Sequence, residues 1–511
     1  MRAKAAALSF ALAVHTASGG SVPQWGRFET AVHNPKPYTN PFAGVSLEAA
    51  FTSPNGKTVR FRGFYDGGDV WKLRFMPDAP GTWTYRSVFS DGTPGPSGSF
   101  ECIPSDLPGP PVPYETNPIW FGTKNGEPLA VRSFHVGDRF FANRPNAETG
   151  EAWSDSLRAA FLDWAGKQGY NMLSIASHYL NRNSAGRGKG WNTPRLWNFG
   201  MGVPVPSEYG RMEAVLDDLA RRRMFVFPFA GFLGRDSEFP RDTSGQRLYI
   251  SYTLARLVPY WNLLFSVGGP EPLLKGRPYL DRDEIEQTGH LIRILDPFGH
   301  ALSCHNATGD DAFRDSRWSD FGVLQGPKTL DRGALATRLL SNHHYSKPLV
   351  AQETLWPGNT QGHPPYGDAD IRKNALVILF SGACLNFADM AGNSSTGFSG
   401  SMDLSVKVQR RHDIAKAAWD LFESFPYHRM KPRQGVSDKG FCLAEPGRCY
   451  LVYVEDRYSV RILLEEGTYE AVWINAQNPS DRVSAGIVPV VQTLSPPDRG
   501  DDWLLWIEVE R

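Results

Sequence analysis

The sequence has few cysteines, no excess of charge of either sign and no long apolar run. Five cysteines in 511 residues are too few for a disulfide-stabilised scaffold, and no Cys/His spacing resembles a structural zinc site. Lys and Arg number 54 together, and so do Asp and Glu, so no overall field favours nucleic acid or an anionic membrane. No apolar segment reaches the roughly eighteen residues that span a bilayer. We therefore expect no metal or other cofactor, no nucleic-acid partner and no membrane partner.

Aromatic residues, by contrast, are abundant: 15 Trp, 18 Tyr and 30 Phe. The apolar content of 41% and charged content of 21% are typical of a folded soluble protein, and this length predicts two or three domains. Many of the aromatic rings must fill cores. Fifteen Trp nonetheless exceed what packing usually needs, and exposed aromatic faces bind the C–H faces of sugars. This excess favours a carbohydrate partner; the oligomeric state is not indicated.

Residues 1–20, MRAKAAALSFALAVHTASGG, have the pattern of a signal peptide. Arg2 and Lys4 give a basic start, an apolar run follows, and Ala17-Ser18-Gly19 offers small residues for cleavage. The alternative is an apolar N-terminal helix or strand of the folded protein. We predict export to the periplasm or the medium.

Four further segments differ in their pattern of apolar, polar and turn residues. Residues 22–104 alternate apolar and polar side chains between Gly/Pro/Asp turns, which predicts an immunoglobulin-like β-sandwich. Residues 105–117 are rich in proline and predict a stiff linker. Residues 118–425 alternate buried strands with amphipathic helices, and residues 426–511 return to strand patterns that predict a second small β-sandwich. In that last segment Cys442 and Cys449 flank a Pro-Gly turn and could bridge two hairpin strands, although their register is open.

The central segment has the pattern of a (β/α)8 TIM barrel. Helices are expected at 207–223, where Ser207 is the predicted N-cap, at 281–296 and at 374–382. A doubly wound open sheet is the alternative, but no Gly-x-Gly-x-x-Gly follows the first strand. The eight predicted strands are Leu129–Phe134, Asn171–Ala176, Phe225–Phe229, Asn262–Val267, Ala301–Cys304, Phe321–Leu324, Pro348–Gln352 and Cys384–Phe387.

Two glutamates end apolar runs in this segment. WNLLFSVGGPE, the fourth strand, leads into Glu271, and KPLVAQE, the seventh, ends on Glu353. The active site of such a barrel lies at the carboxyl ends of its strands, where a charge must face a cavity or a partner. Glycoside cleavage needs two opposed carboxyls, one to protonate the leaving oxygen and one to attack or stabilise the sugar. The alternative is that each glutamate caps its strand and pairs with an arginine.

Other polar residues follow predicted strands and could bind sugar hydroxyls, because Asn, Gln, His and Asp donate or accept at defined angles. Each could equally be a loop or supporting residue. Trp356, just past Glu353, is a candidate stacking platform, or else packs against the eighth strand. The polar candidates are His135, His178, Tyr179, Asp236, His305, Asn306, Gln325 and Asp389.

Several motifs resemble the apiosidase-like family of glycoside hydrolases, which is related to clan A barrels. These are WGRFE (Trp25–Glu29), FYDGGDVWKLRFMPDAPGTWTYR, GGPE and KPLVAQETLWPGN. The resemblance implies a β-sandwich domain of unknown function in front, and behind the barrel a small domain type that carries a collagen-binding label. It also implies Glu271 as acid/base, Glu353 as nucleophile and retention of anomeric configuration. Pro270 stands where clan A enzymes usually have Asn.

Two other functions remain open from the sequence. A polysaccharide lyase would need a Tyr, His or Lys base and cationic groups that neutralise uronates. A carbohydrate-binding protein on a barrel without catalysis is the second alternative.

Overall fold

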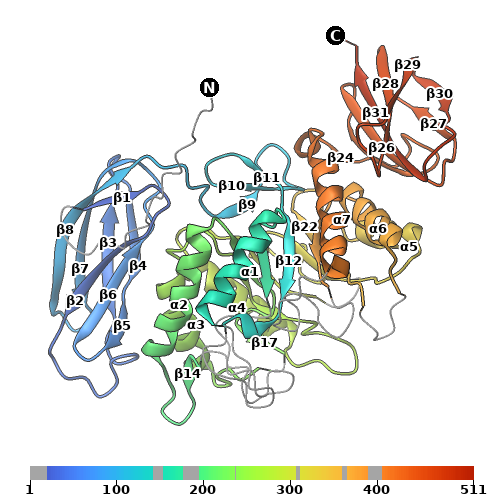
Figure 1. Ribbon diagram of the computed structural model, residues 1–511. Helices are drawn as coiled ribbons and strands as arrows, with labels where there is room; N and C mark the ends of the chain where they lie inside the picture. The colour runs from blue at the N-terminus through green and yellow to red at the C-terminus, as the bar shows by residue number, and fades with distance from the viewer. Residues whose placement is uncertain are drawn as a thin grey trace.

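The computed structural model describes residues 20–141, 154–175, 195–235, 237–306, 311–358, 365–389 and 406–510. An N-terminal all-β part, a central α/β part and a C-terminal all-β part follow one another along the chain (Figure 1). Within the described ranges, no helix combines the length and apolarity needed to cross a membrane. Residues 1–19 of the predicted signal peptide lie outside these ranges.

The N-terminal part is two facing sheets, of order β1-β8-β7-β3-β4 and β2-β6-β5. All neighbours are antiparallel except β1 and β8, which run parallel. Rings from the two sheets stack across the core, Phe28 on Phe100 at 4.2 Å and Phe51 on Phe75 at 4.1 Å. The strands are β1 Ser21–Pro23, β2 Phe28–His33, β3 Leu47–Thr52, β4 Thr58–Arg62, β5 Phe64–Gly67, β6 Val70–Phe75, β7 Gly81–Phe89 and β8 Pro94–Ile103.

The proline-rich segment is partly built into a small sheet. β9 Pro111–Pro113 pairs with β10 Phe121–Thr123, which also pairs with β11 Pro128–Leu129. β9 is an edge strand, where proline is tolerated because no second neighbour needs its N–H. The sheet covers the amino ends of the central strands (Figure 1), with Phe121 5.3 Å from Phe321 between ring centroids. Residues 111–113 of the predicted stiff linker are therefore part of this small sheet.

The core of the central part is a parallel half-barrel sheet of order β16-β13-β12-β23-β22-β21. β18 Phe265–Ser266 and β20 Leu302–Ser303 form a further parallel pair. Leu263 bridges to Val226 of β16, and the Asp320 N–H donates to the Leu302 carbonyl beside β21. The six sheet strands are β12 Ser133–Val136, β13 Met172–Ile175, β16 Phe225–Pro228, β21 Gly322–Gln325, β22 Leu349–Leu355 and β23 Ala383–Phe387.

The first central strand begins later than predicted, because Leu129 belongs to β11 and the strand itself is β12. Two short parallel strands, β17 Leu233–Gly234 and β19 Gly268–Gly269, pair near the carboxyl end. β14 Trp197–Asn198 and β15 Val203–Pro204 form a hairpin.

Helices follow most central strands. α2 differs from its prediction: Val205 is the N-cap and Pro206 opens the helix, so Ser207 is not the cap. Proline suits that position because the first helical N–H groups have no intrahelical partner. The helices are α1 Asp155–Lys167, α2 Pro206–Arg221, α3 Thr243–Leu257, α4 Arg282–Leu295, α5 Arg332–Ser341, α6 Asp368–Phe380 and α7 Val406–Glu423, with 3-10 turns at Asp138–Phe141 and Tyr427–Arg429.

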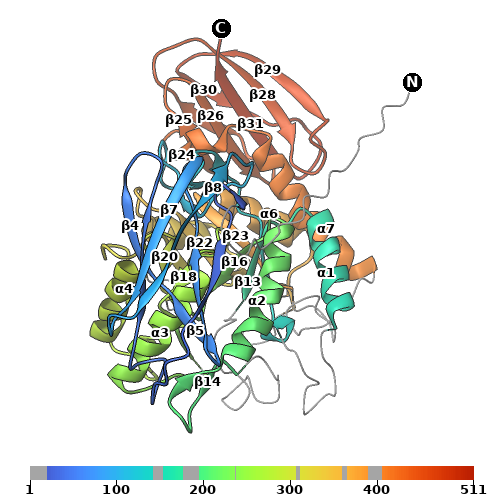
Figure 2. The same cartoon turned by 90° about the vertical axis from the view of Figure 1, so that its left-hand side faces the viewer.

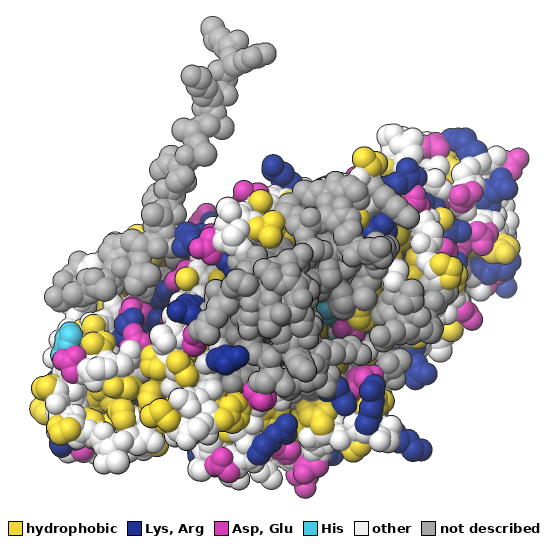
Figure 3. Space-filling model, turned by 60° about the horizontal axis from the view of Figure 1, so that its bottom comes forward, with side chains coloured by type: hydrophobic (Ala, Val, Ile, Leu, Met, Phe, Trp, Pro, Cys, Tyr) yellow, Lys and Arg dark blue, Asp and Glu magenta, His cyan; other side chains and the backbone are white. Residues whose placement is uncertain are grey.

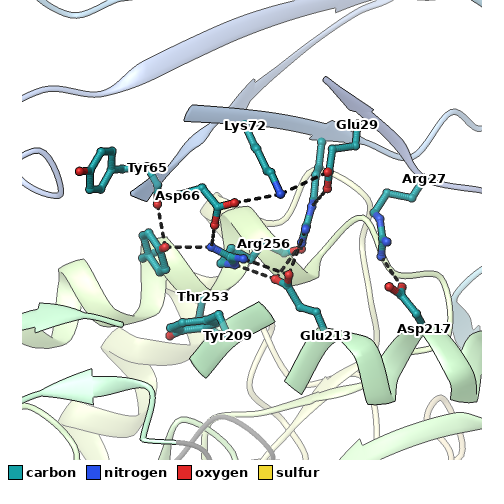
Figure 4. A network of polar contacts seen from close by, with 12 residues as sticks. Arg27, Glu29, Tyr65, Asp66, Lys72, Tyr209, Glu213, Asp217, Thr253 and Arg256 are labelled. Atoms are coloured by element: carbon teal, nitrogen blue, oxygen red, sulfur yellow. Dashed lines mark hydrogen bonds and ion pairs between the residues drawn. The ribbon is translucent and has the colours of Figure 1, made fainter. Parts of the chain in front are cut away.

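The N-terminal sandwich lies against α2 and α3 (Figure 2), and a buried ion network joins them (Figure 4). Arg74 donates to both carboxylate oxygens of Glu213 on α2, at 2.8 and 3.0 Å, and to Glu29 at 2.6 Å. Arg256 on α3 donates to the same two Glu213 oxygens at 2.6 and 2.9 Å, and to Asp66 at 2.6 Å. Glu213 is thus clamped between two guanidinium groups, one from each part of the chain.

Charges balance within this network. Lys72 lies 2.9 Å from Asp66 and 3.4 Å from Glu29, which gives three cations and three carboxylates. Burial would raise the pKa of Glu213, but Arg256 and Arg74 hold it well below its usual range. Buried charges tolerate desolvation only when they are paired and hydrogen-bonded in this way.

The C-terminal part is a six-stranded antiparallel sheet, β24-β25-β26-β31-β28-β29, with the pair β27-β30 beside it. It packs on α6, where Arg372 donates to both oxygens of buried Asp502 at 3.1 and 2.8 Å. The strands are β24 Lys431–Pro432, β25 Phe441–Glu445, β26 Cys449–Glu455, β27 Val460–Leu463, β28 Tyr469–Asn475, β29 Arg482–Val488, β30 Val491–Leu494 and β31 Asp502–Val509.

The possible Cys442–Cys449 bridge is absent, and both thiols are free. The hairpin register pairs Cys442 with Val452, while Cys449 faces Glu445. Because the two cysteines are not opposite each other, the register itself rules out the bridge.

Candidate active site

Both predicted glutamates lie at the carboxyl end of the parallel strands and share an unusual backbone. Glu353 lies inside β22, which continues to Leu355 with a register irregularity after Ala351, so the strand does not end on it as predicted. Glu271 follows β19 by two residues. Their φ angles are +51° and +55°. This left-handed conformation costs a non-glycine residue roughly 1–2 kcal/mol and is concentrated at functional sites.

Glu353 is nearly buried beside a histidine of fixed tautomer. Its Oε1 lies 4.0 Å from Nδ1 of His135 on β12. That nitrogen accepts from Gln352 Nε2 at 3.1 Å, and Gln352 Oε1 accepts from Ser174 at 3.0 Å. The neutral imidazole therefore carries its proton on Nε2. Burial, together with the Lys328 ammonium, lowers the pKa of His135 to about 3.

A row of rings connects this glutamate to the other one. The His135 ring centroid is 5.8 Å from that of Trp356 and 5.1 Å from that of Phe229. Phe229 in turn meets His305 edge-on at 5.1 Å. The His305 carbonyl accepts the Glu271 N–H at 2.9 Å. The two glutamates therefore flank one continuous surface made of residues that follow different strands.

The backbone of the Glu271 turn is held by Arg235. Its guanidinium donates to the Pro270 carbonyl at 3.1 Å and to the Glu271 carbonyl at 2.6 Å, and lies 4.5 Å from the Tyr279 ring centroid. The exposed Arg277 guanidinium is 3.8 Å from Glu271 Oε2. This arrangement leaves the Glu271 side chain 12% exposed while its main chain is held by Arg235.

Gly269 brings the same turn close to the ring surface. A Cβ at this position would lie 2.5 Å from both the His305 Cβ and the Phe229 carbonyl oxygen. Any side chain would therefore push the turn away from the ring row.

His305 is the least satisfied polar group of the site. It is fully buried, and neither ring nitrogen has a hydrogen-bond partner within the part of the chain that the structure describes. Burial, with contributions from His135 and Lys328, lowers the pKa of His305 to about 3. An unmet buried donor or acceptor costs about 1–3 kcal/mol, so a ligand hydroxyl at this imidazole would recover that loss.

The remaining predicted residues divide into two groups. Trp356 borders His135, with the Lys328 ammonium 4.5 Å from its ring centroid, and Gln325 ends β21 half-buried. Asn306 and Asp389 instead hold the framework. Asn306 donates to Cys304 and Asp311, and Asp389 accepts from Arg411 through both oxygens, at 3.0 and 2.9 Å.

Burial would raise the pKa of Asp389, but hydrogen bonds from His412 and Arg411 hold it below its usual range. The Asp389 carboxylate is thus engaged by Arg411 of α7, and its role in sugar binding stays a prediction. His178, Tyr179 and Asp236 lie outside the described residues.

Sequence reasoning missed Gln352, Arg235, Phe229 and Lys328. Gln352 carried a usable signal, because an amide inside the apolar run KPLVAQE must face a polar partner. The other three gave none, since their roles depend on residues that follow other strands.

We expect the free energy of unfolding to fall as the pH is lowered from 6.5 toward 3. His135 and His305 have folded pKa values of about 3 and an ordinary value of 6.5 when unfolded. Their contribution is thus complete above pH 6.5 and is lost as the unfolded chain gains protons first. Each should cost about 2 kcal/mol at pH 5. Urea unfolding at several pH values measures this.

The control is His305→Asn, which should flatten the pH dependence, against His33→Asn at an exposed site. An equal pH dependence in both variants would contradict the assignment.

On the face to which the carboxyl ends of the central strands point, basic and acidic side chains are interspersed around the residues drawn in grey (Figure 3).

The family model of a domain of unknown function (DUF5060) matches residues 21–90, which lie in the N-terminal sandwich. No curated protein matches the chain.

Solved structures resemble the chain over most of its length. A candidate glycoside hydrolase from Bacteroides vulgatus is 18% identical, covers 96% of this chain and 100% of its own, and has a TM-score of 0.72. A glycoside hydrolase is 15% identical over 80% of this chain and 99% of its own, with a TM-score of 0.59. A family 5 glycoside hydrolase from B. vulgatus is 15% identical over 78% and 94%, with a TM-score of 0.56. At such identities the likeness establishes that the chain shares their multidomain fold.

Proposed function

We propose that this chain is a secreted, retaining glycoside hydrolase that cleaves a poly- or oligosaccharide with Glu353 and Glu271. The supporting observation is the pair of left-handed glutamates, one inside β22 and one two residues after β19, on either side of one row of buried rings. The glycoside hydrolases among its structural neighbours support the same reaction class. In this proposal the central part is a full (β/α)8 barrel between two accessory sandwiches, with boundaries at 22–104, 118–425 and 426–511.

In the first step the Glu353 carboxylate attacks the anomeric carbon while Glu271 donates its proton to the leaving oxygen. The bond to the leaving sugar breaks, and a glycosyl ester forms on Glu353. In the second step Glu271 takes a proton from water, whose oxygen attacks the same carbon and releases Glu353. Two inversions at one carbon retain its configuration. The neutral His135 beside Glu353 can donate from Nε2 to a sugar hydroxyl without neutralising the carboxylate.

Sugar recognition is assigned to the ring row. In this proposal Trp356, which is 6% exposed with the Lys328 ammonium 4.5 Å from its ring centroid, borders the sugar, and His305 has two nitrogens without partners among the described residues. A sugar hydroxyl both donates and accepts, so it suits a neutral imidazole in either tautomer. Membership of the apiosidase-like family and the type of the C-terminal domain stay predictions.

The expected result is release of reducing sugar from one member of a panel of plant and algal polysaccharides, with retained configuration. Proton NMR of the first product measures its α/β ratio before mutarotation. A new chain end of inverted configuration would rule out the double displacement. An unsaturated product absorbing in the ultraviolet would instead identify a lyase.

A further inference from the structure

A groove of about 590 Å³ lies between the start of α5 and the C-terminal sheet. One wall is the segment from Leu330 to Gly333. The other wall is formed by residues just before and at the start of β25, by the end of β26 and by the turn that follows β26. The residues lining this second wall are Lys439, Gly440, Phe441, Val454, Glu455, Asp456 and Tyr458. We call it the α5 groove.

The α5 groove begins close to the candidate cleft. Lys328, whose ammonium lies over the Trp356 ring, is two residues from Leu330. Two residues of fully extended chain span at most about 7 Å. The backbone at the start of the α5 groove therefore lies within about 7 Å of the Lys328 backbone, so the groove begins close to the residues around Trp356.

The lining combines an exposed aromatic ring with hydrogen-bonding groups of both signs. Tyr458 is 55% exposed, and the Lys439 ammonium lies 5.5 Å from its ring centroid. Arg332 Nη1 and Glu455 Oε2 lie 3.5 Å apart, and Arg332 also donates to Asp370 at 2.8 Å. A sugar hydroxyl can accept from a guanidinium group and donate to a carboxylate, whereas an apolar ligand can do neither.

The charges of the groove favour a neutral ligand. Arg332 and Lys439 oppose Asp331 and Glu455, while Asp456 is paired at 2.7 Å with Lys373 of α6. Neither a polyanion nor a polycation would find a surface of one opposite sign.

From this geometry we propose that the α5 groove is a distal subsite for a neutral glycan chain that extends from the cleft onto the C-terminal part. This rests on the proposed function and deepens it: the substrate would be a polymer rather than a short oligosaccharide. Tyr458 would stack on one sugar ring, with Arg332 and Glu455 contacting its hydroxyls. The C-terminal sheet would then act in substrate binding.

The test is native affinity electrophoresis in gels containing xylan, mixed-linkage β-glucan or galactan. Wild-type protein and the Tyr458→Ala variant are compared with Tyr345→Ala, a residue of similar exposure (48%) located beyond the far end of α5. We expect one polysaccharide to retard the wild type and Tyr345→Ala, and the dissociation constant of Tyr458→Ala to be about tenfold higher. Circular dichroism and the melting temperature check that the variants fold.

Equal retardation of the wild type and Tyr458→Ala, or no retardation by any of the three, would overturn the proposal. Because binding is measured without turnover, the groove and the hydrolase activity can fail separately. Where hydrolysis is found, the ratio of kcat/KM on polymer to that on an aryl glycoside should fall about tenfold in Tyr458→Ala. An unchanged ratio would place the groove outside the path of the substrate.

Discussion

Replacing Glu353 by Gln is expected to lower kcat by about 10³- to 10⁵-fold. Gln is nearly isosteric with Glu, so the bulge in β22 and the contact with His135 should persist. The amide cannot form the glycosyl ester, however, and it removes the negative charge that stabilises the cationic sugar in the transition state. Initial rates of sugar release, with affinity for the same polysaccharide measured in parallel, check this.

Two further variants make the result specific. Glu271→Gln should lose activity on natural glycosides but recover much of its kcat/KM on an aryl glycoside whose leaving group needs no proton, because kcat/KM reports the first step; Glu353→Gln should not recover. Glu48→Gln, the same change on the exposed surface of β3, should keep full activity. A Glu353→Gln enzyme with wild-type kcat would end the two-glutamate mechanism, and unaltered sugar binding without any hydrolysis in the wild type would favour a carbohydrate-binding protein.

The Glu213→Gln variant should lose about 3–5 kcal/mol of stability. Glu213 is 5% exposed and accepts from Arg74 and Arg256 through both oxygens. In the variant, the buried guanidinium groups of Arg74 and Arg256 no longer share a carboxylate. The new amide N–H₂ is itself a hydrogen-bond donor and faces the N–H donors of these two groups. The melting temperature and the urea midpoint, followed by tryptophan fluorescence, measure the loss.

Asp218→Asn on the same helix is the matched control. Asp218 pairs with Arg221 and Arg222 at the surface, so its loss should cost no more than about 1 kcal/mol. If Glu213→Gln were as stable as this control, the network would contribute little to holding the sandwich on α2 and α3. Because the chain has several parts, a separate early transition in Glu213→Gln would report release of the sandwich.

Local patterns predicted the elements of this protein well where burial follows directly from sequence spacing. The alternation of Trp83, Tyr85 and Phe89 placed a strand of the sandwich, and apolar runs placed the central strands to within a few residues. The same runs located Glu271 and Glu353, because a charge beside a buried strand is costly unless it faces a cavity or a partner. The (β/α)8 closure and the roles of both glutamates remain predictions.

Side-chain contacts that form only when the chain folds could not be predicted in this way. Asn306 and Asp389 have the side chains of sugar-binding residues, yet in the structure they are hydrogen-bonded to Asp311 and Arg411. Conversely, nothing in the sequence around Arg74 indicated its contacts with Glu213 of α2 and Arg256 of α3. The sequence by itself thus determined where most strands lie and that Glu271 and Glu353 stand near the carboxyl ends of strands, since spacing along the chain decides side-chain direction. Only the tertiary structure decided which polar groups are paired, because partners such as Arg74 and Glu213, 139 residues apart, meet through packing alone.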